Sequence, residues 1–428
     1  MGRLFGSGAG GSRPPAAVLA VEGLFSALVL NLATAYTTMF ASRLGANDNQ
    51  IGLFSALPQL VALIVLLPGT LLAGRLTDRR RPVEISLLAA GFLYGLAGFS
   101  PYLRDIRVWY LLGVVSLANA PVALYNTSWQ NYFSDIIPAA ERNAAYSRRT
   151  SRTFIVSIIV IQLTGSILGG VARDAVRITL YQACYWLAML CSLLQWLVLR
   201  RAPPDCRRPA TAGGRDLRRA LRELRSARPF LVFCAISLLT HAGWYLAWPL
   251  FFITQVQYMG ANEAWLSYIT VSGNLAIWLT VRFWSRYIEK HGIRFTLIIG
   301  CLSLAANPLL TVSALYLPAG WALPVLVVFS VVSNAAYNPF QLSILQCLLE
   351  VVPETYKPLN LSFYTSLLLL ANTVMPIIGI RLYACLGSDL RAITLAMLIS
   401  GLVRLGGAGL FAWRWYRLRR EPDSGRRS

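Results

Sequence analysis

The sequence has 428 residues, of which 56% are hydrophobic and only 13% are charged. An ordinary soluble domain carries roughly 25% charged residues. The charges are unbalanced, with 39 Lys and Arg against 18 Asp and Glu and a formal net charge of +21. This composition excludes disordered, collagen-like and disulfide-framework proteins, and it predicts an integral membrane protein.

Apolar runs follow one another along the chain, and each approaches the roughly 20 residues that cross a bilayer. The first six lie near residues 16–41, 50–73, 83–103, 108–135, 153–172 and 176–199. Six more lie near residues 230–254, 263–283, 295–315, 321–350, 359–383 and 391–413. We therefore predict an all-α polytopic membrane protein whose twelve transmembrane helices form two pseudo-symmetric six-helix bundles, at residues 16–199 and 230–413.

The placement of Lys and Arg predicts the orientation of these spans. If the tail of residues 1–15 is cytoplasmic, the cytoplasmic segments carry 31 basic residues and the opposite loops carry 7. Such an excess is typical of cytoplasmic loops, so we expect the linker 200–229 and the tail 414–428 to be cytoplasmic too. We expect the protein to lie in the plasma membrane. Because the arginines separate apolar spans, they do not indicate a nucleic-acid partner.

The basic linker contains one local pattern. Leu217, Leu221 and Leu224 recur at helical spacing among arginines. This spacing predicts a short amphipathic helix on the inner membrane surface, with a solvated linker as the alternative.

An internal repeat relates the two halves. Polar residues of the fourth predicted span recur in the tenth at an offset of 215, as in Asn119 and Asn334 or Asp135 and Glu350. A second match joins the loops after spans two and eight at an offset of 211. The repeat predicts two halves related by an axis along the membrane normal.

The first of these loops carries a recognisable motif. Its residues, Gly74-Arg-Leu-Thr-Asp78-Arg79-Arg-Arg81, resemble the loop motif Gly-x-x-x-Asp-Arg/Lys-x-Gly-Arg/Lys of the major facilitator superfamily, with Arg81 at the second Gly position. The resemblance implies a transporter that works by alternating access. It also implies a cytoplasmic gate built from Gly74, Asp78, Arg79 and Arg152, with Glu289 and Lys290 as the second-half counterparts. The alternative is that these charges only set the topology.

Polar and aromatic side chains within the spans are candidates for a substrate cavity. Polar groups at membrane depth are costly unless they face a cavity or a partner, and helical spacing places many of these on common faces. Ordinary hydrogen bonding between helices is the alternative for each of them. The predicted lining residues are Tyr36, Asn119, Asn126, Gln130, His241, Trp244, Tyr245, Trp248, Asn274, Trp278, Asn334, Asn338 and Gln341.

Two further residues concern protons and charge. Glu22 is an acid well inside the first span, and a carboxyl at membrane depth can take up and release a proton. We expect it to couple transport to protons, with His241 as a second titrating group. Pairing of Glu22 with an arginine near the cytoplasmic end is the alternative. Arg404 lies inside the last span and is given no role.

Together these patterns predict a secondary active transporter for a small organic solute. Proton-linked efflux of an amphipathic compound is the first expectation, and uptake of a sugar-like or other polar metabolite is the alternative. A non-transporting sensor and a membrane-embedded enzyme are remote alternatives, so we expect no enzyme activity. The sequence has no P-loop, and no cofactor, metal site or nucleic-acid partner is expected. The expected partners are the solute, the bilayer and protons, and the expected state is a monomer.

Overall fold

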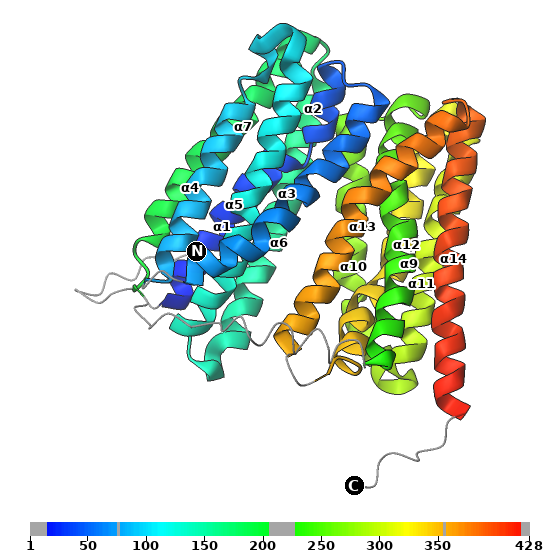
Figure 1. Ribbon diagram of the computed structural model, residues 1–428. Helices are drawn as coiled ribbons and strands as arrows, with labels where there is room; N and C mark the ends of the chain where they lie inside the picture. Colours follow the sequence, from blue (N-terminus) through cyan, green and yellow to red (C-terminus); the bar gives the residue numbers. More distant parts are fainter. Residues whose placement is uncertain (1–14, 75–77, 205–226, 354–356, 421–428) are drawn as a thin grey trace. The chain divides into compact units, whose positions relative to one another are not determined.

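The computed structural model describes residues 15–74, 78–204, 227–353 and 357–420, and all regular structure in these ranges is helical. The predicted amphipathic helix around Leu217 lies outside the described residues. The helices of the first half are α1 (Pro15–Thr34), α2 (Thr37–Arg43), α3 (Asp48–Gly74), α4 (Arg80–Ala97), η1 (Ser100–Ile106), α5 (Arg107–Ile136), α6 (Ala139–Gly170) and α7 (Asp174–Leu199). Those of the second half are α9 (Arg228–Ile253), η2 (Thr254–Tyr258), α10 (Glu263–His291), α11 (Ile293–Leu315), α12 (Ala319–Leu349), α13 (Lys357–Cys385) and α14 (Leu390–Arg420); Figure 1 labels most of these helices.

Eleven helices in the described ranges are long and apolar enough to cross a membrane. Of the predicted spans, α4 is absent from that set, because Arg80, Arg81 and Glu84 place three charges in its 18 residues. Its remaining residues are mostly apolar, and α4 packs along α5. The predicted all-α polytopic membrane fold is thus confirmed.

The chain forms two compact units. Unit 1 contains Met1–Thr37, Ile64–Ile161 and Ala175–Ala210, and unit 2 contains Thr38–Leu63, Gln162–Asp174 and Thr211–Ser428. These units do not follow the predicted bundle boundaries of 16–199 and 230–413, which stay predictions about the duplicated halves.

Unit 1 has an apolar core near the ends of α1, α5 and α7. Tyr132 and Leu199 have no exposed surface there, and Leu19 is 1% exposed. Trp129 stacks on Phe133 with ring centroids 5.0 Å apart. By contrast, α7 leaves large apolar side chains exposed, including Leu190 and Leu197, as expected of a helix with a face toward lipid.

Unit 2 has two apolar cores. The first joins α9, α11, α12 and α14 through residues such as Phe233, Cys301 and Phe340. The second joins α9, α13 and α14 to Ile51 of α3. In unit 2, α11 packs against α12 and α14, while α9 packs against α13 and α14, and Figure 1 shows these helices side by side.

A buried ion pair attaches the first-half segments of unit 2 to its second-half helices. Arg43, the last residue of α2, donates from Nε and Nη2 to the two carboxylate oxygens of Glu263, at 3.1 and 3.2 Å. Glu263 opens α10 and has no exposed surface. Asp174 lies 3.7 Å from the same guanidinium. Paired in this bidentate way, Glu263 can be buried without an uncompensated charge.

Two of the prolines inside helices, Pro339 and Pro308, free a backbone carbonyl that a side chain of another helix satisfies. A proline removes the hydrogen bond to the carbonyl four residues earlier, and in lipid that carbonyl needs a new donor. Pro339 of α12 frees the carbonyl of Ala335, and the Trp284 indole of α10 donates to it at 2.7 Å. Pro308 of α11 frees the carbonyl of Leu304, and Arg404 of α14 donates to that one at 2.8 Å.

Glycine allows close approach of α9 and α13. A Cβ at Gly379 would collide with the backbone carbonyl oxygen of Leu246, and a backbone atom cannot move away without shifting its helix. Small residues at helix contacts allow this closeness in membranes.

Gly379→Ala is therefore expected to destabilise unit 2. Overpacking at a tight contact costs about 1–3 kcal/mol, which exceeds the gain of about 1 kcal/mol from replacing glycine in a helix. Thermal unfolding of the detergent-solubilised protein should show a lower midpoint. Gly409→Ala on α14 is the control, because nothing lies near its Cβ position and its midpoint should stay equal or rise. Equal midpoints for both variants would contradict this contact.

Candidate functional site

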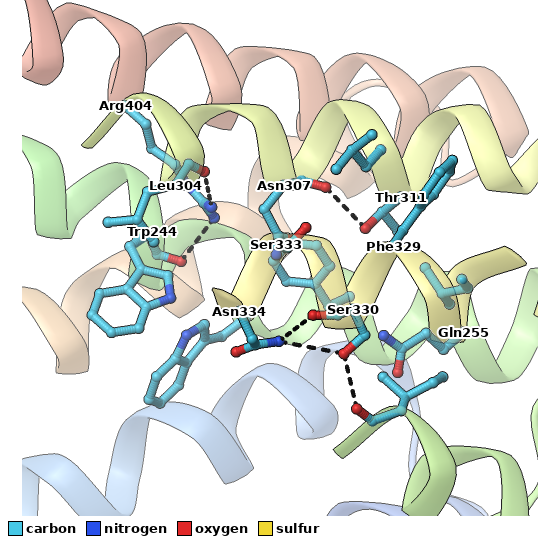
Figure 2. A pocket seen from close by; sticks show the side chains of 15 residues that line it. Trp244, Gln255, Leu304, Asn307, Thr311, Phe329, Ser330, Ser333, Asn334 and Arg404 are labelled. Carbon is cyan, nitrogen blue, oxygen red and sulfur yellow. Dashed lines mark hydrogen bonds between the residues drawn. The ribbon is translucent and has the colours of Figure 1, made fainter. Parts of the chain in front are cut away.

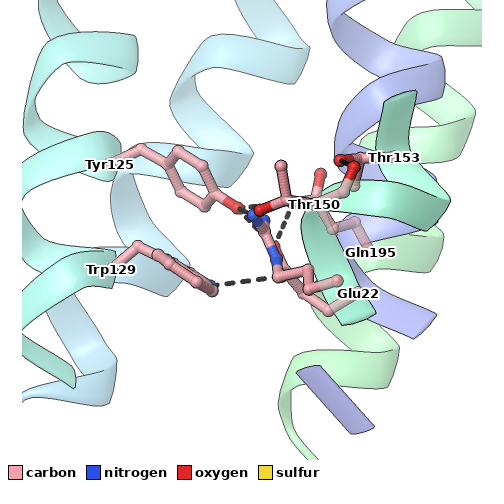
Figure 3. A network of polar contacts seen from close by, with 7 residues as sticks. Glu22, Tyr125, Trp129, Thr150, Thr153 and Gln195 are labelled. Atoms are coloured by element: carbon pink, nitrogen blue, oxygen red, sulfur yellow. Dashed lines mark hydrogen bonds and ion pairs between the residues drawn. The ribbon is translucent and has the colours of Figure 1, made fainter. Parts of the chain in front are cut away.

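A buried cluster around Glu22 lies within unit 1. Its carboxylate has no exposed surface and accepts hydrogen bonds from four side chains. Tyr125 and Gln195 donate to Oε1, the latter at 2.6 Å, and Trp129 and Arg149 each donate to Oε2 at 3.2 Å. Figure 3 shows Tyr125 and Trp129 of α5 and Gln195 of α7 around the Glu22 side chain.

The Glu22 cluster is held together by more than the ion pair. The guanidinium of Arg149 lies over the ring of Trp129, 3.9 Å from its centroid, and Gln195 also donates to the Tyr125 hydroxyl at 3.1 Å. A cation over an indole face is attracted to it. The sequence analysis gave pairing with an arginine as the alternative role for Glu22, without saying which arginine. In the structure that arginine is Arg149.

The α5 cavity, of about 80 Å³, borders the Glu22 cluster. Tyr125 and Gln195 belong to both, and Asn126 is the one predicted cavity residue in this lining. The remaining lining residues are mostly apolar: Ser26, Val29, Leu30, Leu87, Ala90, Tyr94 and Val122.

The α12 cavity, of about 200 Å³, lies within unit 2. Of the predicted residues, Trp244, Trp248 and Asn334 line it. The other lining residues, which the sequence did not single out as cavity residues, are Phe251, Gln255, Ile269, Leu304, Asn307, Leu310, Thr311, Leu326, Phe329, Ser330, Ser333 and Arg404. Figure 2 shows amides, hydroxyls and the Arg404 guanidinium around this space.

Polar groups on α12 face this cavity at helical spacing. Asn334 donates to the Ser330 carbonyl at 2.9 Å, and Ser330 donates to the Ile269 carbonyl of α10 at 2.8 Å. The spacing of Ser330 and Ser333 with Asn334 could have marked this face in the sequence. The amides of Gln255 and Asn307 have no side-chain hydrogen bond to any described residue.

The remaining predicted residues of α9 and α12 do not line the α12 cavity. His241 is 5% exposed, and its Nδ1 lies 2.8 Å from the Ser237 carbonyl. Tyr245 is buried and stacks on Trp244. Asn338 donates to the Ile277 carbonyl at 2.8 Å, joining α12 to α10. Gln341 is exposed.

The other predicted residues are more dispersed. Tyr36 is buried and donates to the Ile161 carbonyl at 2.7 Å. Asn119 donates to Val115 of its own helix at 3.0 Å. Gln130 and Trp278 are exposed, and Asn274 is half-buried.

Only some of the predicted gate residues make polar contacts within the described part of the structure. Gly74 ends α3, and Asp78 accepts from the backbone N–H of Arg80 at 3.0 Å. Arg79 forms an ion pair with Asp135 at the end of α5. Arg152, Glu289 and Lys290 are exposed.

The ion pair of Arg79 has a counterpart in the second half. Arg294 of α11 donates from Nε to the Glu350 carboxylate after α12, at 2.9 Å. Adding 215 to Arg79 and Asp135 gives Arg294 and Glu350, the offset of the repeat seen in the sequence. Each pair joins two neighbouring helices of its own unit, α4 with α5 and α11 with α12.

The duplicated ion pair indicates that the two halves of this polytopic helical membrane protein are repeats, an organisation found in many transporters. The family model described as Major Facilitator Superfamily matches residues 18–346. The chain therefore belongs to the major facilitator superfamily of transporters. A search of curated proteins gives no match.

Solved structures share the fold at low sequence identity. A mutant of the peptide transporter POT, in complex with alafosfalin, is 13% identical with a TM-score of 0.71, over 97% of this chain and 96% of that one. The xylose transporter XylE from E. coli, in an inward open conformation, is 14% identical with a TM-score of 0.69, over 93% and 96%. A mutant of the nucleoside transporter NupG is 15% identical with a TM-score of 0.66, over 92% and 99%.

Arg149→Ala is expected to destabilise the protein strongly, because it leaves the Glu22 carboxylate buried without a cation. Breaking a buried pair from one side costs about 3–5 kcal/mol. The double variant Glu22→Gln/Arg149→Ala should recover part of this loss, since no charge is then left unpaired. Thermal unfolding in detergent measures both. Arg148→Ala is the control, because Arg148 is exposed and bonds only within its own helix; a double variant less stable than Arg149→Ala would argue against the pairing.

The two repeated ion pairs should differ in strength. Asp135 is 10% exposed and Glu350 is 39% exposed, and exposed pairs contribute about 0–1 kcal/mol. Asp135→Asn should therefore lower the unfolding midpoint more than Glu350→Gln does. Added salt should diminish the small effect of Glu350→Gln further. A larger loss from Glu350→Gln would contradict the ranking.

Proposed function

We propose that this chain is a secondary active transporter that exports a small amphipathic compound by alternating access, driven by protons. The observation that supports this most directly is the α12 cavity, because it combines tryptophans with amides and hydroxyls inside a membrane-spanning unit. Such a lining can stack on an apolar ring and hydrogen-bond the polar edge of the same molecule.

Glu22 is the proposed proton-coupling group. As a carboxylate it accepts four hydrogen bonds, one of them from Arg149. Protonation would remove the ion pair and turn one oxygen into a donor, so the cluster would have to rearrange. The proton state of Glu22 would in this way bias the contacts among α1, α5, α6 and α7, and a bias of this kind can shift a protein between two conformations.

Uptake of a polar metabolite is the second candidate. It is favoured by the free amides of Gln255 and Asn307 in the α12 cavity, since such groups suit a solute rich in hydroxyls. The structures with the same fold include a xylose transporter and a nucleoside transporter.

The gate and the setting of the protein are part of the same proposal. We place the protein as a monomer in the plasma membrane with both termini cytoplasmic, the orientation that its basic segments favour. Gly74, Asp78 and Arg79 would act at the cytoplasmic gate, with Arg152, Glu289 and Lys290 pairing in other conformations. The Arg43–Glu263 pair would act at the opposite end, since it joins helices of both sequence halves.

Glu22→Gln is expected to abolish the proton dependence of transport, because glutamine keeps the shape and loses the titrating group. The test uses proteoliposomes with and without an imposed pH gradient and three labelled probes: fluorescein as an amphipathic solute, and glucose and uridine as polar ones. Probe movement that responds to the gradient in the wild type and not in Glu22→Gln supports the proposal. Glu84→Gln, in the second turn of α4 and outside the Glu22 cluster, is the control and should keep the response.

Two outcomes would count against the proposal. Unchanged pH dependence in Glu22→Gln would remove Glu22 from coupling. Outward movement of fluorescein supports export, whereas inward movement of glucose or uridine supports the second candidate, and no movement of any probe speaks against both.

A further inference from the structure

Arg404 places a positive charge in the interior of unit 2, and no acidic side chain within the described part of the chain balances it. It is 1% exposed, although it lies in the middle of the apolar helix α14. Among the residues that the structure describes, no carboxylate pairs with it. A cation at membrane depth is costly without a partner, and such residues mark functional sites by default.

The hydrogen bonds of Arg404 go to backbone carbonyls only. Nε donates to Gly243 at 3.1 Å, Nη1 to Leu304 at 2.8 Å and Nη2 to Trp244 at 3.4 Å. A guanidinium has five N–H groups. Among the described residues, two of them therefore have no acceptor, one on each terminal nitrogen. Carboxylate and phosphate oxygens are the acceptors that guanidinium N–H groups bind most strongly.

Satisfying these carbonyls does not by itself require a charge. The carbonyl that Pro339 frees in α12 is satisfied by a neutral indole, that of Trp284. The Gly243 carbonyl already accepts from the Ser400 hydroxyl at 2.7 Å. A neutral side-chain donor at position 404 could therefore hydrogen-bond these backbone carbonyls at a lower desolvation cost than a charged one. The positive charge needs another explanation.

The surroundings of Arg404 supply the rest of a binding site. Arg404 lines the α12 cavity, which has a volume of about 200 Å³. Asn307 and Gln255 bring uncommitted amides to the same space, and Trp244 and Trp248 bring aromatic faces. Figure 2 shows the guanidinium between the carbonyls of Leu304 and Trp244, on the same side of the view as the indole of Trp244.

We infer that the α12 cavity binds a small organic anion, with its carboxylate or phosphate on Arg404 and its apolar part against the tryptophans. This inference rests on the proposed transport function and names the class of solute. The ligand would supply the negative charge that none of the described residues places beside Arg404. An amphipathic solute with one acidic group meets both halves of the lining.

The test measures equilibrium binding of radiolabelled benzoate to the full chain in detergent. Unlabelled benzamide and benzamidine have nearly the same shape but are neutral and cationic, so they isolate the effect of charge. Phenyl phosphate distinguishes a phosphate ligand from a carboxylate, and sodium chloride tests for an inorganic anion. We expect saturable binding that benzoate or phenyl phosphate displaces and the other three do not.

Variants of Arg404 assign the binding to this residue. Arg404→Gln should weaken benzoate binding about tenfold or more, the effect of losing charge-assisted hydrogen bonds. Arg404→Lys keeps the charge without the planar fork and should bind with intermediate affinity. Arg391→Gln removes a charge from an exposed position of the same helix and should bind as the wild type does. Asn307→Ala is a milder change in the same lining and should also weaken benzoate binding. It keeps the test valid if Arg404→Gln does not fold.

Several outcomes would overturn the inference: no saturable benzoate binding, equal displacement by benzamide, benzamidine or chloride, or wild-type affinity in Arg404→Gln. The liposome assay separates this result from the proposed function. Benzoate that binds through Arg404 but never crosses the membrane contradicts transport and keeps the anion site. Movement of glucose or uridine without benzoate binding keeps transport and rejects the anion site.

Discussion

A charge buried in a membrane protein must find a partner, and this constraint shapes both units. In unit 1 the Glu22 carboxylate gathers Arg149 and three neutral donors, two hydrogen bonds on each oxygen. In unit 2 the Glu263 carboxylate is held by the fork of Arg43. Each of these contacts ties helices that lie far apart in the sequence, because lipid offers a buried charge no alternative. Arg404 donates three hydrogen bonds to backbone carbonyls, and no carboxylate of the described residues balances its charge.

The duplication reaches down to individual contacts. The pairs Arg79–Asp135 and Arg294–Glu350 are related by the same offset of 215 as the polar residues of the fourth and tenth spans. In each pair an arginine near the start of one helix binds a carboxylate near the end of the neighbouring helix. Such a contact fixes how the two antiparallel helices meet. Its recurrence in both units indicates that each half folds its helix pair in the same way, with the second copy more exposed to water.

The sequence predicted the helices well, because a span is a local property that length and hydropathy determine. The sequence offset of 215 recurs in the ion pairs of the structure, and three of the residues expected in a substrate cavity, Trp244, Trp248 and Asn334, line the α12 cavity. The loop alignment at an offset of 211 pointed to Glu289 and Lys290, whereas the ion pair recurs at 215 with Arg294. Short charged loops can be aligned in several registers, and only a contact identifies the equivalent residues.

The residues that sequence reasoning missed depend on tertiary contacts. Nothing local connects Glu22 with Arg149, which lies 127 positions away, and backbone carbonyls such as those around Arg404 leave no trace in a sequence. Even so, one inference was within reach: an arginine in a span with no acid on its own helix face is a charge without a local partner. In lipid the missing partner must come from another helix or from a ligand. Once the structure removes the first possibility among the described residues, the second becomes the physical explanation for the charge.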